Sequence, residues 1–201
     1  MQVEFHYFDG GTVNAYSQRY LQFWCKKVGL EIVEKADVVL VSINDPGFYN
    51  KLRALRKKRP TAKIIVGGFE GYRGEWMLGI ADYVVAGKGE RFLTELAKGE
   101  IPVDLPEVYS RATVDTKACY PFEDNDIDAM PLIRTSPSAF TGMYSFGCRN
   151  KCAFCFTSWV QVYRTGSTAH VVELHRQAKK DYSNKMRFSF VMNDFQPGIF
   201  P

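Results

Sequence analysis

Three cysteines lie within eight residues, in the stretch from Gly147 to Phe156. Cys148, Cys152 and Cys155 form a Cys-x3-Cys-x2-Cys pattern. A loop this short brings three thiolates around one small inorganic group, and soft sulfur ligands favour an iron–sulfur cluster or zinc. Three ligands leave a four-coordinate site open at one position. The pattern therefore predicts a metal centre that can accept one further ligand.

Zinc is the competing interpretation of the same loop. Cys152 and Cys155 are followed after fourteen residues by His170 and His175, a spacing within the range of a zinc finger with two cysteines and two histidines. This set leaves out Cys148, and the histidine spacing turns the two rings about 140° apart around a helix. We expect the two histidines to be helix residues with hydrogen-bonding roles. The alternative function is a zinc-stabilised module that binds protein or nucleic acid without catalysis.

The composition is that of a globular protein, with 46% hydrophobic and 14% aromatic residues in 201. The formal charge of +4 is small, and we interpret the basic run 53–59 as the solvated end of a helix rather than a nucleic-acid patch. We see no leader and no apolar run near the roughly 18 residues of a membrane span, so we expect a soluble, cytoplasmic protein. The five cysteines do not suggest a disulfide framework, and Cys25 and Cys119 are predicted to be small buried hydrophobes.

The first half of the chain alternates short apolar runs with amphipathic segments. The runs predict strands at 3–8, 30–33, 37–43, 63–66 and 83–86. Between them we expect three helices. The first has apolar positions at Tyr16, Tyr20, Phe23, Trp24 and Val28. The second starts at Asn44-Asp45-Pro46 and ends before Pro60, and the third is short and ends before Gly99. This rhythm predicts an α/β fold, a Rossmann-like open parallel sheet over residues 1–99.

Small or polar residues follow several of these predicted strands. They are Asn44, Gly67, Gly68, Gly87 and Gly89. Parallel sheets bind ligands at the carboxyl ends of their strands, so these residues are candidate ligand contacts. Tight turns explain the glycines equally well, because no Gly-x-Gly-x-x-Gly follows the first strand.

Residues 100–138 are rich in proline and lose periodicity, so we interpret them as an interdomain linker. Residues 139–201 begin a second domain. A strand is expected at 140–146, running directly into the cysteine loop, then a helix capped by Ser167 or Thr168, and then a strand at 187–192.

The cysteine loop resembles that of the radical S-adenosylmethionine superfamily. The resemblance rests on Cys148-x3-Cys152-Ala-Phe154-Cys155 after a glycine at the end of a strand. The segments 36–42, 62–68 and 81–90 resemble strands of the cobalamin-binding domain that precedes the radical domain in one subfamily. Together the resemblance covers most of residues 30–99 and 140–195, and it implies that the second domain is the first βαβ portion of a partial (β/α) barrel.

The resemblance implies a 4Fe–4S cluster on Cys148, Cys152 and Cys155, with the fourth iron open to S-adenosylmethionine. One electron from a donor protein then releases methionine and a 5′-deoxyadenosyl radical, for methyl transfer or another modification of a substrate that the sequence does not define. Phe154 would pack near the adenine. Asn193 and Asp194 would hold the methionyl amino group, although they also suit a simple turn after a strand.

Two departures from the family pattern concern cobalamin and length. The cobalamin signature Asp-x-His-x-x-Gly is absent after the first strand, and His6 lies within that strand, so the domain either binds cobalamin without this histidine or keeps only the fold. The second domain offers one helix and two strands of a longer barrel. We therefore expect a second chain or a further carboxyl-terminal segment to complete it.

A third and weaker hypothesis is an RNA-modifying enzyme that transfers a methylthio group. Those enzymes resemble this chain in architecture, but they use three further cysteines in their first domain. Only Cys25 is available there.

Overall fold

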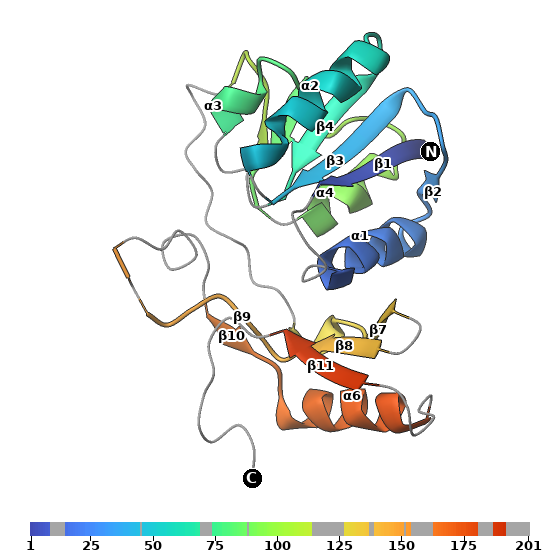
Figure 1. The fold of residues 1–201 in the computed structure, drawn as a ribbon, viewed down its shortest axis with the longest axis vertical. Coiled ribbons are helices and arrows are strands. Elements are labelled where there is room, and N and C mark those ends of the chain that lie inside the picture. The colour runs from blue at the N-terminus through green and yellow to red at the C-terminus, as the bar shows by residue number, and fades with distance from the viewer. Residues whose placement is uncertain are drawn as a thin grey trace. The chain divides into compact units, whose positions relative to one another are not determined.

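A six-stranded sheet forms the centre of the first unit (Figure 1). The computed structural model describes residues 1–8, 15–44, 46–68, 74–87, 89–113, 127–136, 139–150, 152–153, 163–180 and 187–191. It divides into two compact units, Met1–Tyr120 and Pro121–Pro201. The strands of the first unit are β1 (Gln2–Phe8), β2 (Glu31–Ile32), β3 (Val38–Ile43), β4 (Lys63–Gly67), β5 (Tyr83–Val85) and β6 (Val108–Tyr109).

The sheet has the order β2-β1-β3-β4-β5-β6, and all neighbours are parallel except β5 and β6. Side chains of a strand point alternately to its two faces, so a parallel sheet covered on both sides needs continuous apolar strands. In β3, Val39 and Val41 join one core, whereas Leu40 joins the other. The predicted α/β class with a mostly parallel sheet is confirmed.

Helices cover both faces of this sheet (Figure 1). They are α1 (Ala15–Lys27), α2 (Tyr49–Lys58), α3 (Gly74–Met77) and α4 (Gly89–Leu96). Leu52 and Leu55 of α2 pack into the first core, and Phe92 and Leu96 of α4 pack into the second. The predicted inner face of α1 is wrong at Phe23, which is 41% exposed.

The start of α2 differs from the prediction. A 3-10 turn, η2, covers Pro46–Phe48, and α2 follows with Phe48 as its N-cap and without a side-chain cap bond. Asn44 instead donates its amide N–H to the hydroxyl of Tyr7 at 2.8 Å. Asn44 therefore links the ends of β1 and β3, while Asp45, the residue directly before Pro46 and the predicted cap, lies outside the described residues.

Residues 100–138 contribute a strand to each unit. β6 pairs with β5 at the edge of the first sheet, and β7 (Ile133–Ser136) pairs with β8 in the second unit. The 3-10 turn η4 (Ile127–Ala129) lies just ahead of β7, and Ile127 is buried. Two parts of the stretch predicted as a linker, β6 and β7, are thus paired in sheets.

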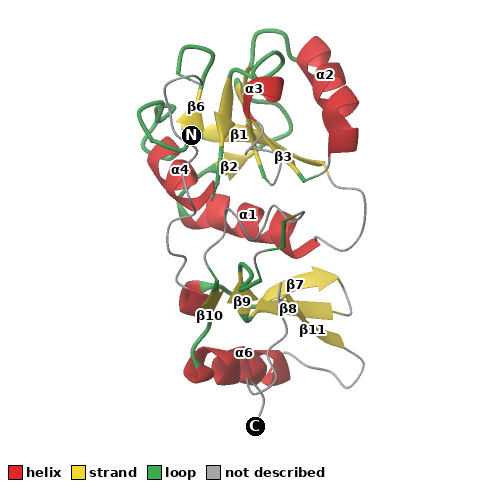
Figure 2. Cartoon of the chain, turned by 90° about the vertical axis from the view of Figure 1, so that its left-hand side faces the viewer, coloured by secondary structure: helices red, strands yellow, loops and turns green. Residues whose placement is uncertain are grey.

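The second unit has a three-stranded sheet with the order β11-β8-β7 (Figure 2). β8 (Ala139–Met143) is parallel to β11 (Arg187–Val191) and antiparallel to β7. Between β8 and β11 the chain forms β9 (Ser145–Phe146), β10 (Arg164–Thr165) and α6 (Thr168–Lys180). The predicted strand 140–146 is therefore split into β8 and β9. The unit contains a parallel strand–helix–strand arrangement.

Helix α6 lies close to β8 because Gly142 has no side chain. A Cβ on Gly142 would come within 2.9 Å of Leu174 Cδ1 of the helix. Ser167 caps the helix, as predicted, since its Oγ accepts a hydrogen bond from the His170 N–H at 3.1 Å. Asp128 in turn accepts a hydrogen bond from the Ser167 N–H at 2.7 Å. Hydrogen bonds from Ser167 lower the pKa of Asp128.

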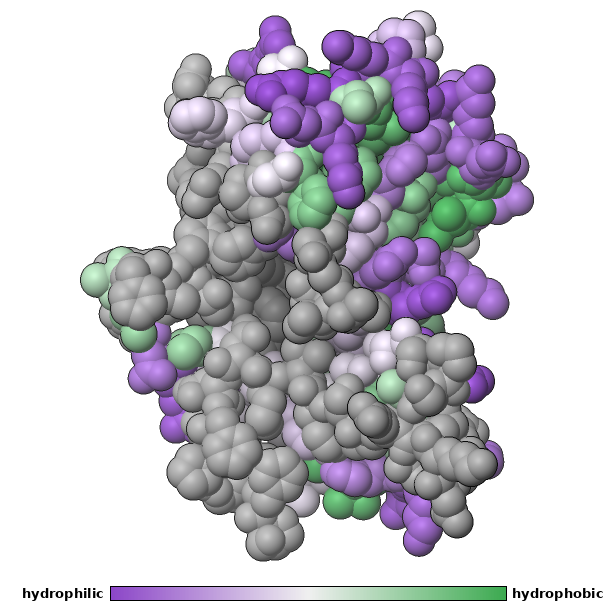
Figure 3. Space-filling model, in the orientation of Figure 1, coloured by the Kyte–Doolittle hydropathy of each residue, from purple (hydrophilic) through white to green (hydrophobic). Residues whose placement is uncertain are grey.

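The outward face of α2 is hydrophilic (Figure 3). Within the basic run, Arg53, Lys57 and Lys58 are exposed, but Arg56 and Arg59 are half-buried and have partners in the chain. The interpretation of this run as a solvated helix end holds for only part of it. Across the described residues, no helix has the length and apolar character needed to cross a membrane.

Candidate metal centre

A short antiparallel ladder closes the cysteine loop at its base. β9 precedes the loop and β10 follows it, with Phe146 opposite Arg164 and Ser145 opposite Thr165. The Gly166 N–H adds a hydrogen bond to the Tyr144 carbonyl oxygen at 2.8 Å. The two ends of the segment 147–163 are therefore held side by side. Loop closure of this kind lowers the entropy cost of gathering ligands from one segment.

Two of the three predicted metal ligands are described. Cys148 and Cys152 are half-buried and form no disulfide bond. Gly147, just ahead of them, has φ of 76°, a left-handed conformation that favours glycine and turns the chain out of the strand. Cys155 and Phe154 lie outside the described residues, and within the described ones no group of three metal-ligating side chains occurs.

The donors present in the loop fit a soft metal or an iron–sulfur cluster. Two accessible thiols lie in a short segment that is closed at its base, and thiolate is the ligand type that zinc and iron–sulfur clusters select. By contrast, Cys25 is fully buried in α1, and burial raises the pKa of its thiol to about 11. Its predicted role as a small core residue is confirmed, and it has no access to a metal. Cys119 lies outside the described residues.

An aromatic–cation contact lies beside the first cysteine. The guanidinium carbon of Arg149 is 4.7 Å from the centre of the Tyr163 ring. Arg149 follows Cys148 directly, and Tyr163 precedes β10. The contact therefore ties the start of the loop to its end.

The two histidines of the zinc alternative are bonded to other groups. His170 is buried, and its Nε2 is 3.3 Å from the Met143 carbonyl oxygen. The His175 Nδ1 lies 2.8 Å from the Val171 carbonyl oxygen and 3.1 Å from the Tyr144 hydroxyl. Tyr144 is itself buried, which raises its pKa. These contacts match the predicted hydrogen-bonding roles and disfavour a zinc site that uses both rings.

The residues proposed for S-adenosylmethionine are not among those described. Phe154 belongs to the loop, and Asn193 and Asp194 come after the last residue of β11, Val191. β11 lies next to β8 and parallel to it, so the ends of these two strands share one edge of the second sheet.

The second candidate site lies at the carboxyl edge of the first sheet. The strand order places a topological switch point between β1 and β3, where parallel α/β sheets bind ligands. The Tyr7–Asn44 hydrogen bond lies at this point. Gly68 has φ of 93°, and a Cβ on it would come within 2.7 Å of the Ile43 carbonyl oxygen. Close packing of neighbouring strand ends therefore explains Gly68 without a ligand.

The remaining glycines of this edge differ from Gly68. Gly87 has φ of 120° and requires glycine for its backbone, whereas a Cβ on Gly67 or Gly89 would meet its nearest atoms at ordinary contact distances of 3.8 and 3.6 Å. His6 lies within β1, as predicted, with its Nε2 2.7 Å from Glu4 Oε1. His6 is thus held by a neighbour on its own strand.

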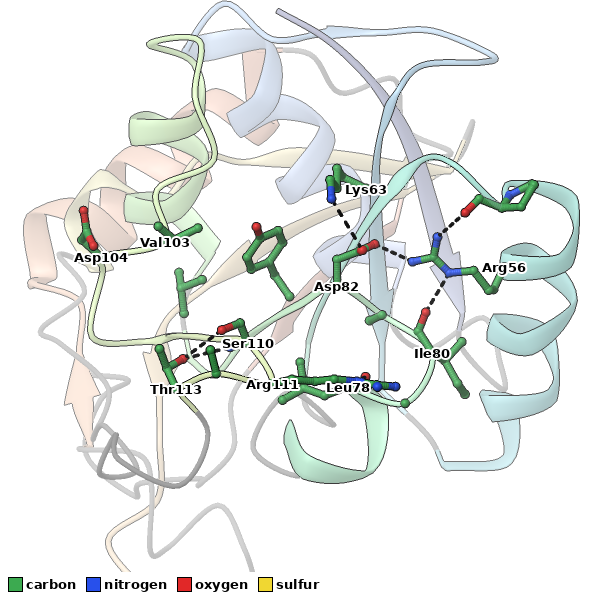
Figure 4. A pocket seen from close by; sticks show the side chains of 16 residues that line it. Arg56, Lys63, Leu78, Ile80, Asp82, Val103, Asp104, Ser110, Arg111 and Thr113 are labelled. Carbon is green, nitrogen blue, oxygen red and sulfur yellow. Dashed lines mark hydrogen bonds and ion pairs between the residues drawn. The ribbon is translucent and has the colours of Figure 1, made fainter.

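The groove in Figure 4 lies at the opposite, amino edge of the first sheet and has a volume of about 710 Å³. Its arginine side chains are bonded mainly to backbone carbonyl oxygens, and Arg56 also pairs with Asp82. Arg56 donates to the Ile80 and Ala62 carbonyl oxygens, each at 2.8 Å, and to Asp82. Arg111 donates to the Leu78 carbonyl oxygen at 2.7 Å. These bonds join α2 to the segments around β5, so the groove is built mainly of structural contacts.

Sequence reasoning missed two polar groups of the cysteine loop. The hydroxyls of Ser145 and Tyr163 are buried and have no hydrogen-bond partner among the described residues. The sequence offers only the position of Ser145, two residues before Gly147, as an indication.

No protein-family model matches the chain, and no curated protein matches it.

Proposed function

We propose that this chain carries the S-adenosylmethionine-binding portion of a radical enzyme, with a 4Fe–4S cluster on Cys148, Cys152 and Cys155. The observation that carries the proposal is the order strand, cysteine loop, helix, parallel strand in the second unit. It supports the proposal because the loop follows β8 after the two-residue strand β9, and β11, the parallel neighbour of β8, ends at the same edge as β8. Ligands of parallel α/β arrangements bind at that edge.

When bound, a three-thiolate cluster with an open iron supplies one-electron cleavage of the sulfonium of S-adenosylmethionine. The chain's own residues supply binding and orientation. The cysteine thiolates hold the metal, and the β9–β10 ladder keeps the two ends of the loop together. In the proposal, Phe154 packs against the adenine, and Asn193 and Asp194 contact the methionyl amino group.

The proposal also includes a partner for β11. Among the described strands, β11 has β8 as its neighbour on one side, and an open parallel edge is a surface that proteins normally cover. A strand from a second chain or from further sequence would extend the sheet into the partial barrel that the resemblance implies. An electron donor protein is the second partner.

Cobalamin binding by the first unit is the least supported part of the proposal. The switch point between β1 and β3 is a suitable place for a ligand. Gly68, however, is explained by packing, and His6 is bonded to Glu4. We therefore propose a cobalamin-binding-like fold, with any cobalamin bound without a histidine from β1.

Metal analysis of protein purified without oxygen tests the proposal. We expect iron and acid-labile sulfide in equal amounts, and binding of S-adenosylmethionine that disappears when the metal is removed. Zinc without sulfide would contradict the proposal and support the binding module. Replacing both His170 and His175 by alanine is the matched control, because it should lower the metal content only if zinc is the native metal.

A further inference from the structure

Two hydroxyl groups at the base of the cysteine loop are buried without a hydrogen-bond partner among the described residues. They are Ser145 Oγ, in β9, and Tyr163 OH, next to β10. Ser145 is only 1% exposed. Burying a hydroxyl without a partner is unfavourable, and most such groups in proteins are satisfied. Two of them at the two ends of one loop indicate a shared partner that is not part of the described chain.

Ser145 lies at the base of the loop, near the first metal ligand in the chain. It begins β9, which is separate from β8, and it is opposite Thr165 of β10. Ser145 and Cys148 are three positions apart, which limits their Cα separation to about 11 Å.

Tyr163 approaches the same cysteine from the other end of the loop. Its ring lies against the guanidinium of Arg149, the residue that follows Cys148. A cation–π contact of this kind favours one placement of the ring against the guanidinium. The hydroxyl thus belongs to a ring that contacts the residue next to the first metal ligand, and it is itself unpaired among the described residues.

We propose that Ser145 and Tyr163 donate hydrogen bonds to the sulfur atoms of the metal centre and thereby make its reduction easier. The proposal rests on the function proposed above. Reduction adds negative charge to the sulfurs of a cluster, so donors stabilise the reduced form more than the oxidised form. The positive charge of Arg149 acts in the same direction.

The test is a redox titration of the full chain, reconstituted with iron and sulfide without oxygen and followed by electron paramagnetic resonance. We expect Ser145→Ala and Tyr163→Phe each to shift the reduction equilibrium about tenfold against the reduced form, or about 59 mV for a one-electron couple. Tyr144→Phe is the matched control, because it removes the same atom from a tyrosine whose hydroxyl contacts His175. Ser145→Thr keeps a hydroxyl and should restore the potential.

The outcomes separate this inference from the function on which it rests. If the unaltered chain holds zinc or no sulfide, the proposed function fails and the inference fails with it. Suppose that the unaltered chain and both variants load iron and sulfide equally, and that their reduction equilibria differ by less than twofold. The inference then fails and the proposed function stands. A shift in Tyr163→Phe without one in Tyr144→Phe supports the inference even if Ser145→Ala does not fold.

Discussion

The amino edge of the first sheet and the cysteine loop of the second unit both gather polar side chains, and they differ in where the partners come from. At the amino edge, Asp82 accepts hydrogen bonds from the Ile64 N–H at 2.8 Å and from Arg56, and Arg56 also donates to backbone carbonyls. In the loop, the hydroxyls of Ser145 and Tyr163 have no partner among the described residues. Saturation within the chain is typical of a structural cluster, whereas the two unpaired hydroxyls are the observation on which our ligand proposal for the loop rests.

Substituting Asp82 gives the largest expected loss of stability. Asp82→Ala removes the acceptor of a buried N–H and leaves Arg56 without its anion. We expect the free energy of unfolding to fall by about 3 kcal/mol, measured by urea-induced unfolding. Asp104→Ala, an exposed acidic residue of the same groove, should stay within about 0.5 kcal/mol of the unaltered protein. If the two variants were equally stable, the claim that the hydrogen bonds of Asp82 hold the amino edge together would be contradicted.

Two adjacent glycines sharpen the comparison at the carboxyl edge. Gly68→Ala places a Cβ 2.7 Å from the Ile43 carbonyl oxygen at a left-handed backbone position. We expect a loss of about 2 kcal/mol, because neither the backbone oxygen nor the strand can give way easily. Gly67→Ala meets nothing closer than 3.8 Å and should be nearly neutral in the same unfolding experiment. If Gly67→Ala were destabilising and Gly68→Ala neutral, the close packing would have been assigned to the wrong glycine.

The cap of α6 tests a saturated cluster in the second unit. Ser167→Ala removes the acceptor of the His170 N–H, and we expect about 1 kcal/mol of destabilisation from thermal or urea unfolding. Thr168→Ala is the neighbouring control, since Thr168 is the first helical residue and is exposed. Iron loading should be the same in both variants, because the cap supports the helix rather than the metal. A loss of iron in Ser167→Ala but not in Thr168→Ala would contradict the claim that the cap supports the helix and not the metal.

The smallest effect is a pH dependence of stability from Asp128. Hydrogen bonds from Ser167 lower the pKa of this carboxyl in the folded protein. Its contribution is therefore present above the pKa of the unfolded chain, about 3.9, and is lost as the pH falls through the lower folded pKa. Since Asp128 is exposed, we expect only about 0.3 kcal/mol. In Asp128→Asn, the free energy of unfolding should depend less on pH between pH 5 and pH 2. An unchanged pH dependence would contradict the lowered pKa of Asp128.

Most of the first sheet could be predicted because its long strands are continuous apolar runs that end in glycine or asparagine. β3 and β4 are of this kind. β6, β9 and β10 have two residues each, too few for any periodicity, and they exist only through their pairing with distant residues. Phe23 lies at helical spacing with buried residues and is exposed, because the packing of a whole helix decides which side is covered.

The candidate site could be predicted where residue type and spacing are enough. Cys148 and Cys152 follow from their spacing alone. Ser145 and Tyr163 do not, since their significance is that they are buried and unpaired, which depends on the fold. The inward role of Arg56 could not be predicted either, because its acceptors belong to residues up to 26 positions away.

Reconstitution of the full chain with iron and sulfide, compared between Cys148→Ala and Cys25→Ala, tests the central claim most directly. Both variants remove one thiol, but Cys25 is buried in the second core, whereas Cys148 is accessible in the closed loop. We predict about four irons and four sulfides per chain in the unaltered protein and in Cys25→Ala, and a loss of most of both in Cys148→Ala. Equal loading of the two variants, or no loading of the unaltered chain, would contradict the account.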